Sequence, residues 1–348
     1  MCGFAGALQL NRNATEWQER LQAMGDALRH RGPDDDGQWF DAEAGVGFAF
    51  RRLAVIDPSQ HGGQPMTSAS GRYRLVYNGE IYNSRDLKPD DYVCRGHSDT
   101  EILLALIEDR GLESALERVN GMFAFALWDN RERTLSLVRD RIGIKPLYYG
   151  ICGKAFLFGS ELKAFRRHPE FSGELDTTAM SRFVESGCVP APASIYRNVF
   201  KLPPGSMLEV GPENVSSPRR STYWSAQTMI ENGVETVFAG DDTEADELLH
   251  RRLKDSVTRR MQADVPLGVF LSGGLDSSLI AALAQHHGGR AIDTFTLGFE
   301  DPDYNEAEAA ARTAQHLGTN HMEWIVHADD ALKIIPDLGA IYDEPFGD

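Results

Sequence analysis

The chain begins with Met1-Cys2-Gly3-Phe4-Ala5-Gly6, which places a thiol next to the N-terminus. If Met1 is removed, Cys2 carries both its thiol and a free α-amine. A thiol is a strong nucleophile only as the thiolate, and an α-amine titrates near neutral pH. The amine can therefore accept the thiol's proton without a separate histidine. A cysteine can also stand at position two by chance, so the functional interpretation depends on the motifs downstream.

The composition is that of an ordinary globular protein long enough for two domains. Of 348 residues, 42% are hydrophobic, and 35 basic against 52 acidic residues give a net charge of −17. This balance argues against a surface for nucleic acid or anionic membranes. The sequence lacks a signal-peptide pattern and the ~20-residue apolar run of a membrane span. The four cysteines fit no zinc spacing. We therefore expect a cytoplasmic protein with reduced thiols and with neither nucleic acid nor membrane as a partner.

The first 210 residues have the pattern of an α+β domain. Strands are predicted at 45–50, 52–56, 73–77, 80–82, 122–128 and 134–138, and helices at 16–28 and 99–109. Asn78-Gly79, taken alone, predicts a hairpin turn between residues 73–77 and 80–82. Clusters of strands with segregated helices indicate a layered α+β domain. A change of composition then predicts a linker at 211–243, and helices alternating with strands at 244–348 indicate a parallel α/β sheet.

A glycine-rich loop follows a predicted strand in the second domain. The apolar residues 265–271 precede Ser272-Gly273-Gly274-Leu275-Asp276-Ser277-Ser278, and a helix is predicted after them. Strand, glycine-rich turn and helix in this order point backbone N–H groups at a phosphate. Asp276 can hold a Mg²⁺ that neutralises the phosphates. The loop is neither a Walker A motif nor a dinucleotide fingerprint, and the alternative is an ordinary turn capped by Asp and Ser.

This loop resembles the pyrophosphate-binding loop of the ATP pyrophosphatases, which cleave ATP between the α and β phosphates and adenylate a substrate. The resemblance implies ATP as a co-substrate together with Mg²⁺. It also implies a backbone contact to adenine from Leu297, in the predicted strand 294–299. The residues that the resemblance implies in ATP binding are Leu271, Ser272, Gly273, Gly274, Leu275, Asp276, Ser277, Ser278 and Leu297.

A series of segments in the first domain resembles the class II glutamine amidotransferases, and several of them fit the asparagine synthetase branch. They are Met1–Gly6, His30–Asp34, Arg52–Asp57, Asn78–Asn83, Gly96–Glu101, Asn120–Phe125, Arg139–Arg141 and Lys145–Tyr149. The resemblance implies that Cys2 attacks the side-chain amide of glutamine. It implies an oxyanion hole formed by the Asn78 side chain and the Gly79 backbone N–H. Arg52 would pair with the α-carboxylate of glutamine, and Asp99 would hold its α-ammonium. The implied glutamine-binding set also contains Val55, Ile56 and Glu80.

Each of these residues has an ordinary structural alternative. Asn78-Gly79 is first a hairpin turn, and Arg52 and Asp99 would usually be solvated surface charges. His30 and His97 would usually be hydrogen-bonded structural groups. Their joint occurrence with Cys2, in the order found in the family, favours the functional interpretation.

The two resemblances together cover essentially the whole chain and imply a glutamine-hydrolysing asparagine synthetase. The implied fold is an α+β N-terminal-nucleophile (αββα) layered domain followed by an incomplete α/β Rossmann-like ATP-pyrophosphatase domain. Glutamine hydrolysis at Cys2 would supply ammonia to an aspartyl-adenylate made from ATP and aspartate. The products would be asparagine, glutamate, AMP and pyrophosphate. The family often forms dimers, so a homodimer is an expected assembly.

The sequence departs from the family pattern at its end. A second glycine-rich motif, of the Ser-Gly-Glu-Gly-Ser-Asp-Glu type, does not occur before Asp348. We therefore expect a truncated or split sequence in which glutamine hydrolysis can survive without full synthetase activity. Three other functions stay open. They are amidation of another carboxylate, such as a sugar acid or a peptide, glutamine hydrolysis alone, and a non-catalytic scaffold.

Overall fold

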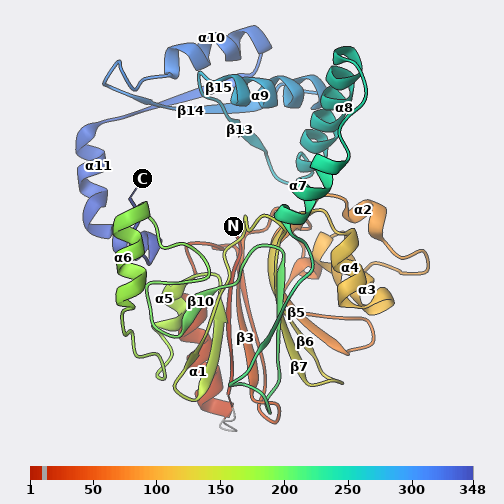
Figure 1. Ribbon diagram of the computed structural model, residues 1–348, viewed down its shortest axis with the longest axis vertical. Coiled ribbons are helices and arrows are strands. Elements are labelled where there is room, and N and C mark those ends of the chain that lie inside the picture. The colour runs from red at the N-terminus through yellow and green to blue at the C-terminus, as the bar shows by residue number, and fades with distance from the viewer. Residues whose placement is uncertain (10–13, 348) are drawn as a thin grey trace. The chain divides into compact units, whose positions relative to one another are not determined.

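The computed structural model describes residues 1–9 and 14–347. The chain forms two compact units, one made of Met1–Glu235 with Gly339–Asp348 and the other of Thr236–Leu338 (Figure 1). The last residues of the chain therefore belong with the first unit rather than with the segment that precedes them. Within the part of the chain that the structure describes, no helix combines the length and apolarity needed to cross a bilayer.

The first unit contains two six-stranded sheets, in which the neighbouring strands run antiparallel. The first sheet has the order β10-β8-β9-β1-β3-β2 and the second the order β12-β11-β7-β6-β5-β4. The first sheet consists of β1 (Gly3–Leu8), β2 (Asp35–Asp41), β3 (Val46–Arg52), β8 (Tyr148–Cys152), β9 (Ala155–Gly159) and β10 (Val199–Lys201). The second consists of β4 (Met66–Thr67), β5 (Tyr73–Ile81), β6 (Gly121–Asp129), β7 (Thr134–Arg139), β11 (Ser206–Val210) and β12 (Arg219–Thr222).

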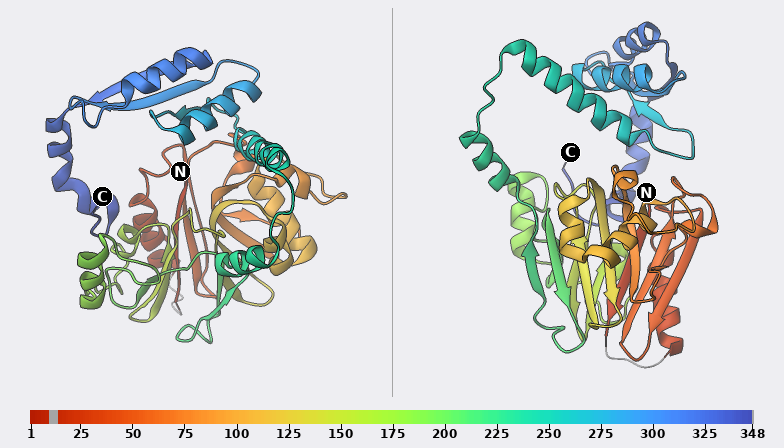
Figure 2. Two further views of the ribbon diagram at one scale, coloured as in Figure 1. Left: turned by 45° about the horizontal axis from the view of Figure 1, so that its top comes forward. Right: turned by 90° about the vertical axis from the view of Figure 1, so that its right-hand side faces the viewer.

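Helices cover the outer faces of the two sheets. α1 (Ala14–Asp26) packs on β1 and β3, and α3 (Asp99–Arg110) packs on β5 and on α4 (Leu112–Arg118) (Figures 1 and 2). The unit thus has four layers in the order helix, sheet, sheet, helix. Its other helical segments are α2 (Ser84–Leu87), α5 (Leu162–Phe165), α6 (Thr177–Ser186), α7 (Ala226–Glu235), α12 (Leu338–Tyr342), which begins one residue before this unit's last segment, and the 3-10 turn η1 (Gln60–Gly62).

The core lies between the two sheets, where inward-facing side chains of both meet. Phe4 and Phe48 of the first sheet and Trp128 and Leu137 of the second belong to one buried cluster. The outer face of the second sheet forms another cluster with Leu103 and its neighbours on α3. The helices predicted at 16–28 and 99–109 and the strands predicted at 122–128 and 134–138 are confirmed in this packing.

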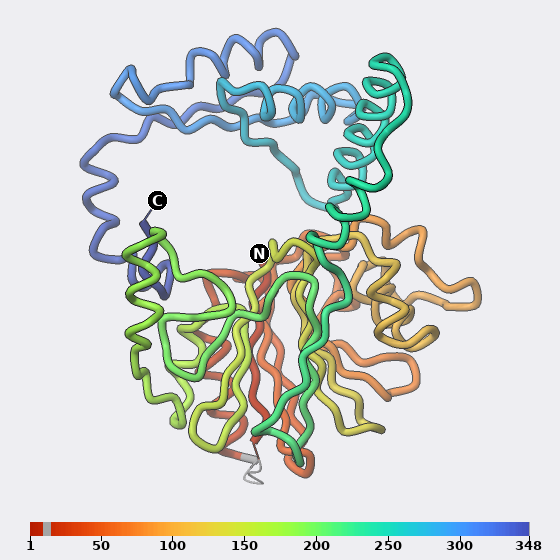
Figure 3. Tube along the Cα trace, viewed as in Figure 1, coloured from red at the N-terminus to blue at the C-terminus, as the bar shows by residue number. Residues whose placement is uncertain are grey.

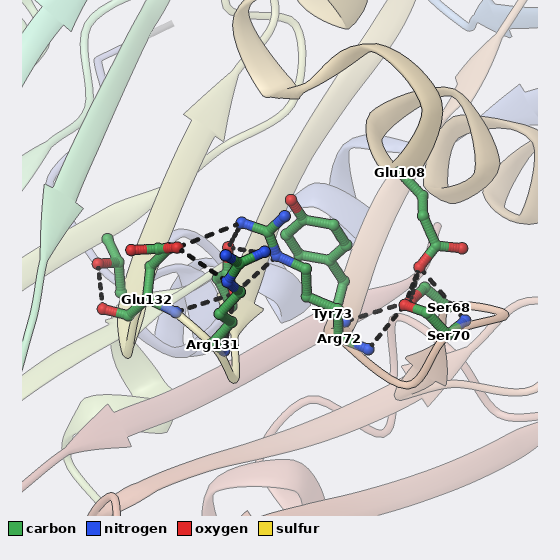
Figure 4. Close-up of polar contacts among 9 residues, drawn as sticks. Ser68, Ser70, Arg72, Tyr73, Glu108, Arg131 and Glu132 are labelled. Carbon is green, nitrogen blue, oxygen red and sulfur yellow. Dashed lines mark hydrogen bonds and ion pairs between the residues drawn. The ribbon is translucent and has the colours of Figure 1, made fainter.

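Polar side chains fix α3 to the chain segment that enters β5. Glu108 of α3 accepts hydrogen bonds from the hydroxyls of Ser68, at 2.6 Å, and Ser70 (Figure 4). Arg72, in the same segment, pairs at 2.6 Å with Asp129 at the end of β6. These contacts tie the start of β5 to α3 and to the end of β6.

The hairpin turn predicted at Asn78-Gly79 is wrong. β5 runs without a break through both residues, with Asn78 opposite Ala124 and Gly79 opposite Phe123 on β6. A Cβ on Gly79 would collide with the Met122 carbonyl and lie 2.7 Å from Phe123 Cα. The glycine therefore serves close approach of two strands rather than a turn.

The strand predicted at 52–56 is also wrong. β3 ends at Arg52, and a loop follows in which Asp57 has a φ of 52°. The Arg52 side chain donates to the Ser59 carbonyl at 2.8 Å and to the Asp57 carbonyl. These bonds fold the chain back around the guanidinium, which an extended strand would prevent.

The second unit contains a parallel sheet in the order β13-β14-β15, as predicted from the alternation of helices and strands. Its elements are α8 (Asp242–Arg260), β13 (Gly268–Phe270), α9 (Leu275–His287), β14 (Asp293–Phe299), α10 (Ala307–Leu317), β15 (Asn320–Val326), α11 (Ala328–Ile334) and the 3-10 turn η2 (Ile335–Asp337). Val257, Leu283 and Ile292 form one small core and Leu271, Ala281 and Ala310 another. The segment 211–243, predicted as the linker, contains β12 and α7, and β12 pairs with β11 of the first unit.

Candidate functional site

Cys2 lies immediately before β1, with its thiol against the loop that follows β3. The Leu53 N–H donates to Cys2 Sγ at 3.4 Å, and the thiol donates to the Leu53 carbonyl at 3.5 Å. Burial raises the pKa of the Cys2 thiol, although the hydrogen bond from Leu53 and the charges of the N-terminal amine and Arg52 oppose this effect. The thiol therefore needs a base beside it to become a nucleophile at neutral pH.

Arg31, which follows α1, holds the backbone of Cys2. Its Nε donates a 2.9 Å hydrogen bond to the Cys2 carbonyl, and its Nη1 pairs with Glu161 Oε1 at 2.6 Å. A Cβ on Gly3 would lie 2.9 Å from Arg31 Cδ. The glycine in the N-terminal motif thus gives the arginine room to approach the nucleophile.

Asn78 lies on β5 of the second sheet and contacts Cys2, which precedes β1 of the first sheet. In the amide orientation that satisfies both neighbours, the Asn78 side-chain nitrogen donates to the Cys2 carbonyl at 3.0 Å and its side-chain oxygen accepts from Arg31 Nη2 at 3.3 Å. The side chain is 1% exposed. Asn78, Arg31 and Cys2 therefore form one hydrogen-bonded group, and Gly79 is the next residue on the same strand.

Asp99 is a buried carboxylate at the start of α3. Its Oδ2 accepts from the Ile81 N–H at 2.8 Å and from the Tyr77 hydroxyl at 3.1 Å. Burial raises the pKa of Asp99, and these hydrogen bonds only partly oppose the rise. Its charge acts on the Cys2 thiol, as does the charge of Arg52, so both predicted glutamine-binding residues lie in the electrostatic range of the nucleophile.

The remaining predicted glutamine-binding residues lie around this group. Val55 and Ile56 are half-buried on the loop that carries Leu53, and Glu80 follows Gly79 on β5. The charge of Glu80 acts on the buried Lys145, whose pKa burial lowers. Lys145 Nζ lies 3.0 Å from Met1 Sδ.

Sequence reasoning assigned no role to Leu53, Arg31, Lys145 or Glu161. Arg31 and Lys145 stand inside motifs that carried the resemblance, so their position near Cys2 could have been inferred. Glu161 lies outside all of those motifs, and only its ion pairs with residues far away in the sequence reveal it.

The glycine-rich loop of the second unit joins β13 to α9. Gly274 precedes α9 without a side-chain cap, and Gly273 N–H donates to the exposed Glu306 carboxylate at 3.1 Å. The Ser272 and Ser277 hydroxyls lie 2.7 Å apart. A loop N–H that already binds a carboxylate oxygen has the geometry for an anion.

Leu297 lies on β14 and lines a cavity of about 670 Å³. Phe270, Phe295, Met322 and Trp324 contribute to the same apolar wall. Asp276, the predicted Mg²⁺ ligand, is exposed on the first turn of α9. Within residues 1–9 and 14–347, no group of three or more His, Cys, Asp or Glu side chains is arranged to hold a metal ion.

Both halves of the chain match models of known protein families. The family model for a glutamine amidotransferase domain matches residues 1–224, and the model for asparagine synthase matches residues 248–348. A solved structure of glutamine phosphoribosylpyrophosphate amidotransferase from B. subtilis is 16% identical with a TM-score of 0.45, over 92% of this chain and 65% of that chain.

Curated relatives align along the entire chain. Asparagine synthetase [glutamine-hydrolyzing] 1 of Bacillus subtilis is 34% identical over 100% of this chain and 54% of its own length. Putative asparagine synthetase [glutamine-hydrolyzing] 2 of Methanocaldococcus jannaschii is 32% identical over 100% of this chain and 69% of its own length. The chain spans about half the length of the Bacillus relatives it matches. With both domain models in order and relatives along its whole length, the chain belongs to the family of glutamine-hydrolysing asparagine synthetases.

Proposed function

We propose that the first unit hydrolyses glutamine at Cys2 and that the complete protein uses the ammonia to make asparagine from aspartate and ATP. The observation that carries this proposal is the convergence of the Cys2 thiol, Leu53 and the Asn78–Arg31 pair at the ends of two sheets. The unit would adopt the N-terminal-nucleophile arrangement, and the second unit would be the first part of a Rossmann-like ATP-pyrophosphatase domain.

Removal of Met1 gives Cys2 its own α-amine as the general base. Before this removal, burial lowers the pKa of the Met1 α-amine beside Cys2, and a similarly buried Cys2 amine would favour the neutral form that accepts a proton. The amine takes the thiol proton, and the thiolate attacks the side-chain carbonyl carbon of glutamine. The amine then passes the proton to the departing nitrogen, the C–N bond breaks, and ammonia leaves. Water hydrolyses the resulting thioester to glutamate and regenerates the thiol.

Fixed donors and charges would orient the substrate for this attack. The Asn78 amide and the Gly79 N–H would stabilise the negative oxygen of the tetrahedral intermediate. Arg52 would bind the α-carboxylate and Asp99 the α-ammonium, with Val55, Ile56 and Glu80 completing the pocket. Selection of both α-groups explains a preference for free glutamine over a glutamine side chain in a protein.

The second unit would bind ATP at the loop 272–278. The N–H groups before α9 and the Ser272, Ser277 and Ser278 hydroxyls would face the phosphates, and Leu297 would contact adenine. Asp276 would give one carboxylate to Mg²⁺, which in nucleotide sites takes its other ligands from phosphates and water. Bound in this way, the ion would neutralise phosphate charge.

Glutamate release from glutamine by this chain tests the proposal. Intact mass confirms that Met1 is absent, and Cys2→Ala serves as the control. Cys2-dependent release supports the amidase half, and its absence in a folded, processed protein contradicts it. A longer version of the chain, supplied with ATP and with aspartate, a sugar acid or a peptide carboxylate, then identifies the acceptor.

A further inference from the structure

A cluster of charged side chains lies behind Cys2, on the side of Arg31. Glu161 precedes α5 and is the centre of this cluster. Its Oε1 pairs with Arg31 Nη1 at 2.6 Å, and its Oε2 pairs with Lys163 Nζ at 2.8 Å and His30 Nε2 at 2.9 Å. Burial alone would raise the pKa of Glu161, but the hydrogen bonds from Lys163 and Arg31 outweigh burial and hold the pKa below its usual value. Glu161 is therefore an ionised, half-buried counter-charge.

Arg31 connects Glu161 to the backbone of Cys2 and to the Asn78 side chain. The Arg31 side chain is only 8% exposed, and it bonds both the Cys2 carbonyl and the Asn78 side chain. A buried guanidinium that loses its carboxylate partner moves to find another or admits water. Either response would shift Cys2 and the Asn78 amide together.

The same cluster extends to the end of the described chain. The Lys163 N–H donates to Asp343 Oδ2 at 2.9 Å, and Lys163 Nζ lies 3.9 Å from the same oxygen. Next to it, Glu344 pairs with Lys201 at 2.7 Å and accepts from the Ile195 N–H at 2.8 Å. Figure 3 shows this last segment, in blue, against the green segments of the first unit.

Docking of this segment is specific rather than incidental. The Asp343 side chain is 3% exposed and the Glu344 side chain 9% exposed. Lysines, Arg166 and backbone N–H groups face these two neighbouring carboxylates and offset part of the cost of their burial. The segment follows directly after the second unit in the chain, and its Asp343 reaches Lys163 through a hydrogen bond and an ion pair.

We propose that Glu161 is a positioning residue for glutamine hydrolysis, and that Lys163 links it to the docked Asp343 so that docking of residues 339–347 controls the alignment of Cys2 and Asn78. The inference rests on the proposed hydrolysis of glutamine at Cys2. It adds a physical route by which the part of the chain that binds the other substrates controls ammonia release.

Kinetics of glutamine hydrolysis with Glu161→Gln, Asp343→Asn and the double variant test this relay. Glu161→Gln should lower kcat/KM by about 10- to 100-fold, mainly in kcat, because a small displacement of reacting groups has such a cost. Asp343→Asn should lower it by about 2- to 30-fold, the usual range for a residue that acts through others. The matched control is Glu174→Gln, which removes an exposed ion pair with Arg197 of 2.6 Å, and it should leave the kinetics unchanged.

The rate of Cys2 alkylation by iodoacetamide separates positioning from loss of structure. Alkylation needs an accessible thiolate but no oxyanion hole. Loss of the Glu161 charge leaves Arg31 uncompensated, which favours the thiolate, so alkylation should equal or exceed that of the unchanged protein. A parallel fall in alkylation and hydrolysis would mean that Glu161 merely holds the fold together, and would overturn the proposal.

The double variant tests the link to Asp343. If Asp343 acts through Glu161, adding Asp343→Asn to Glu161→Gln should cause little further loss. Losses that multiply independently would refute the relay. Unchanged kinetics in Glu161→Gln, with an active unchanged protein, would refute the positioning role and the relay while leaving the proposed hydrolysis of glutamine intact. An unchanged protein that releases no glutamate in a Cys2-dependent manner would refute the proposed function, and the relay with it.

Discussion

The Asn78 side chain donates a 3.0 Å hydrogen bond to the carbonyl oxygen of Cys2. Asn78 lies on β5 of the second sheet and Cys2 directly precedes β1 of the first. The bond therefore spans the two sheets at the end of the core that they enclose. It brings a predicted oxyanion donor to the predicted nucleophile, and it is the geometric basis of the following expectations.

Replacement of the nucleophile should abolish glutamine hydrolysis. Cys2→Ala removes the thiol that would form the thioester, so kcat should fall by at least about 10³-fold. The control is Cys188→Ala, which changes an exposed free cysteine elsewhere in the unit. Glutamate release is measured for both, and residual Cys2-independent release would mean that another residue is the nucleophile.

An extension of the N-terminus should have nearly the same effect. Insertion of Gly-Ser between Met1 and Cys2 leaves the thiol in place but converts its α-amine into an amide that cannot accept a proton. General acid–base catalysis of this kind contributes about 10²- to 10⁴-fold, and hydrolysis should fall by that amount. Iodoacetamide alkylation verifies that the thiol remains accessible. Full activity in the extended protein would show that another base serves Cys2.

A side chain at position 79 should push β5 and β6 apart. In Gly79→Ala, the new Cβ would meet the Met122 carbonyl and lie 2.7 Å from Phe123 Cα. Overpacking of this kind costs about 1–3 kcal/mol of unfolding free energy. Gly233→Ala, in α7 with no atom within 4 Å, should instead be neutral or stabilising. Urea denaturation compares the two, and equal midpoints would contradict the close approach of the strands.

Acid should destabilise the first unit through His168. The side chain is 3% exposed, and burial lowers its pKa from 6.5 to about 4. Between pH 6.5 and about pH 4, His168 binds a proton in the unfolded chain but not in the folded chain. The free energy of unfolding therefore falls as pH decreases. The full loss is about 3 kcal/mol, reached near pH 4. His168→Gln should flatten the decline in the urea midpoint between pH 7 and 4.5. The exposed His61 gives the control, His61→Gln, which should keep the decline.

Loss of Asp276 should affect ATP chemistry and spare glutamine hydrolysis. In a longer version of the chain with synthetase activity, Asp276→Ala should weaken the ATP-dependent reaction at least about tenfold, because a bound ion supplies several kcal/mol. Asp303→Ala, an exposed change in the same unit, is the control. Pyrophosphate and glutamate release are measured side by side. An equal fall in both would contradict the assignment of two separate sites.

The local patterns of the chain were sufficient for much of the fold. Apolar runs predicted β6 and β7, and the 3.6-residue spacing of Trp17, Leu21 and Met24 predicted α1, because burial of one face is encoded in neighbouring residues. The Asn78-Gly79 turn and the strand at 52–56 were wrong. In both places long-range contacts, with β6 for Gly79 and with carbonyls of its own loop for Arg52, outweighed local propensity.

The sequence by itself determined that Cys2 is the candidate nucleophile and that a glycine-rich turn joins a strand to a helix near residues 272–278, because residue type and order carry that chemistry; the structure starts the helix at Leu275, inside the predicted loop. Only the tertiary structure decided how Cys2 is held. Arg31, Asn78 and Glu161 come from three separate parts of the chain. Their hydrogen bonds exist only after the two sheets pack face to face and bury the charges, and no local pattern records which buried charge meets which.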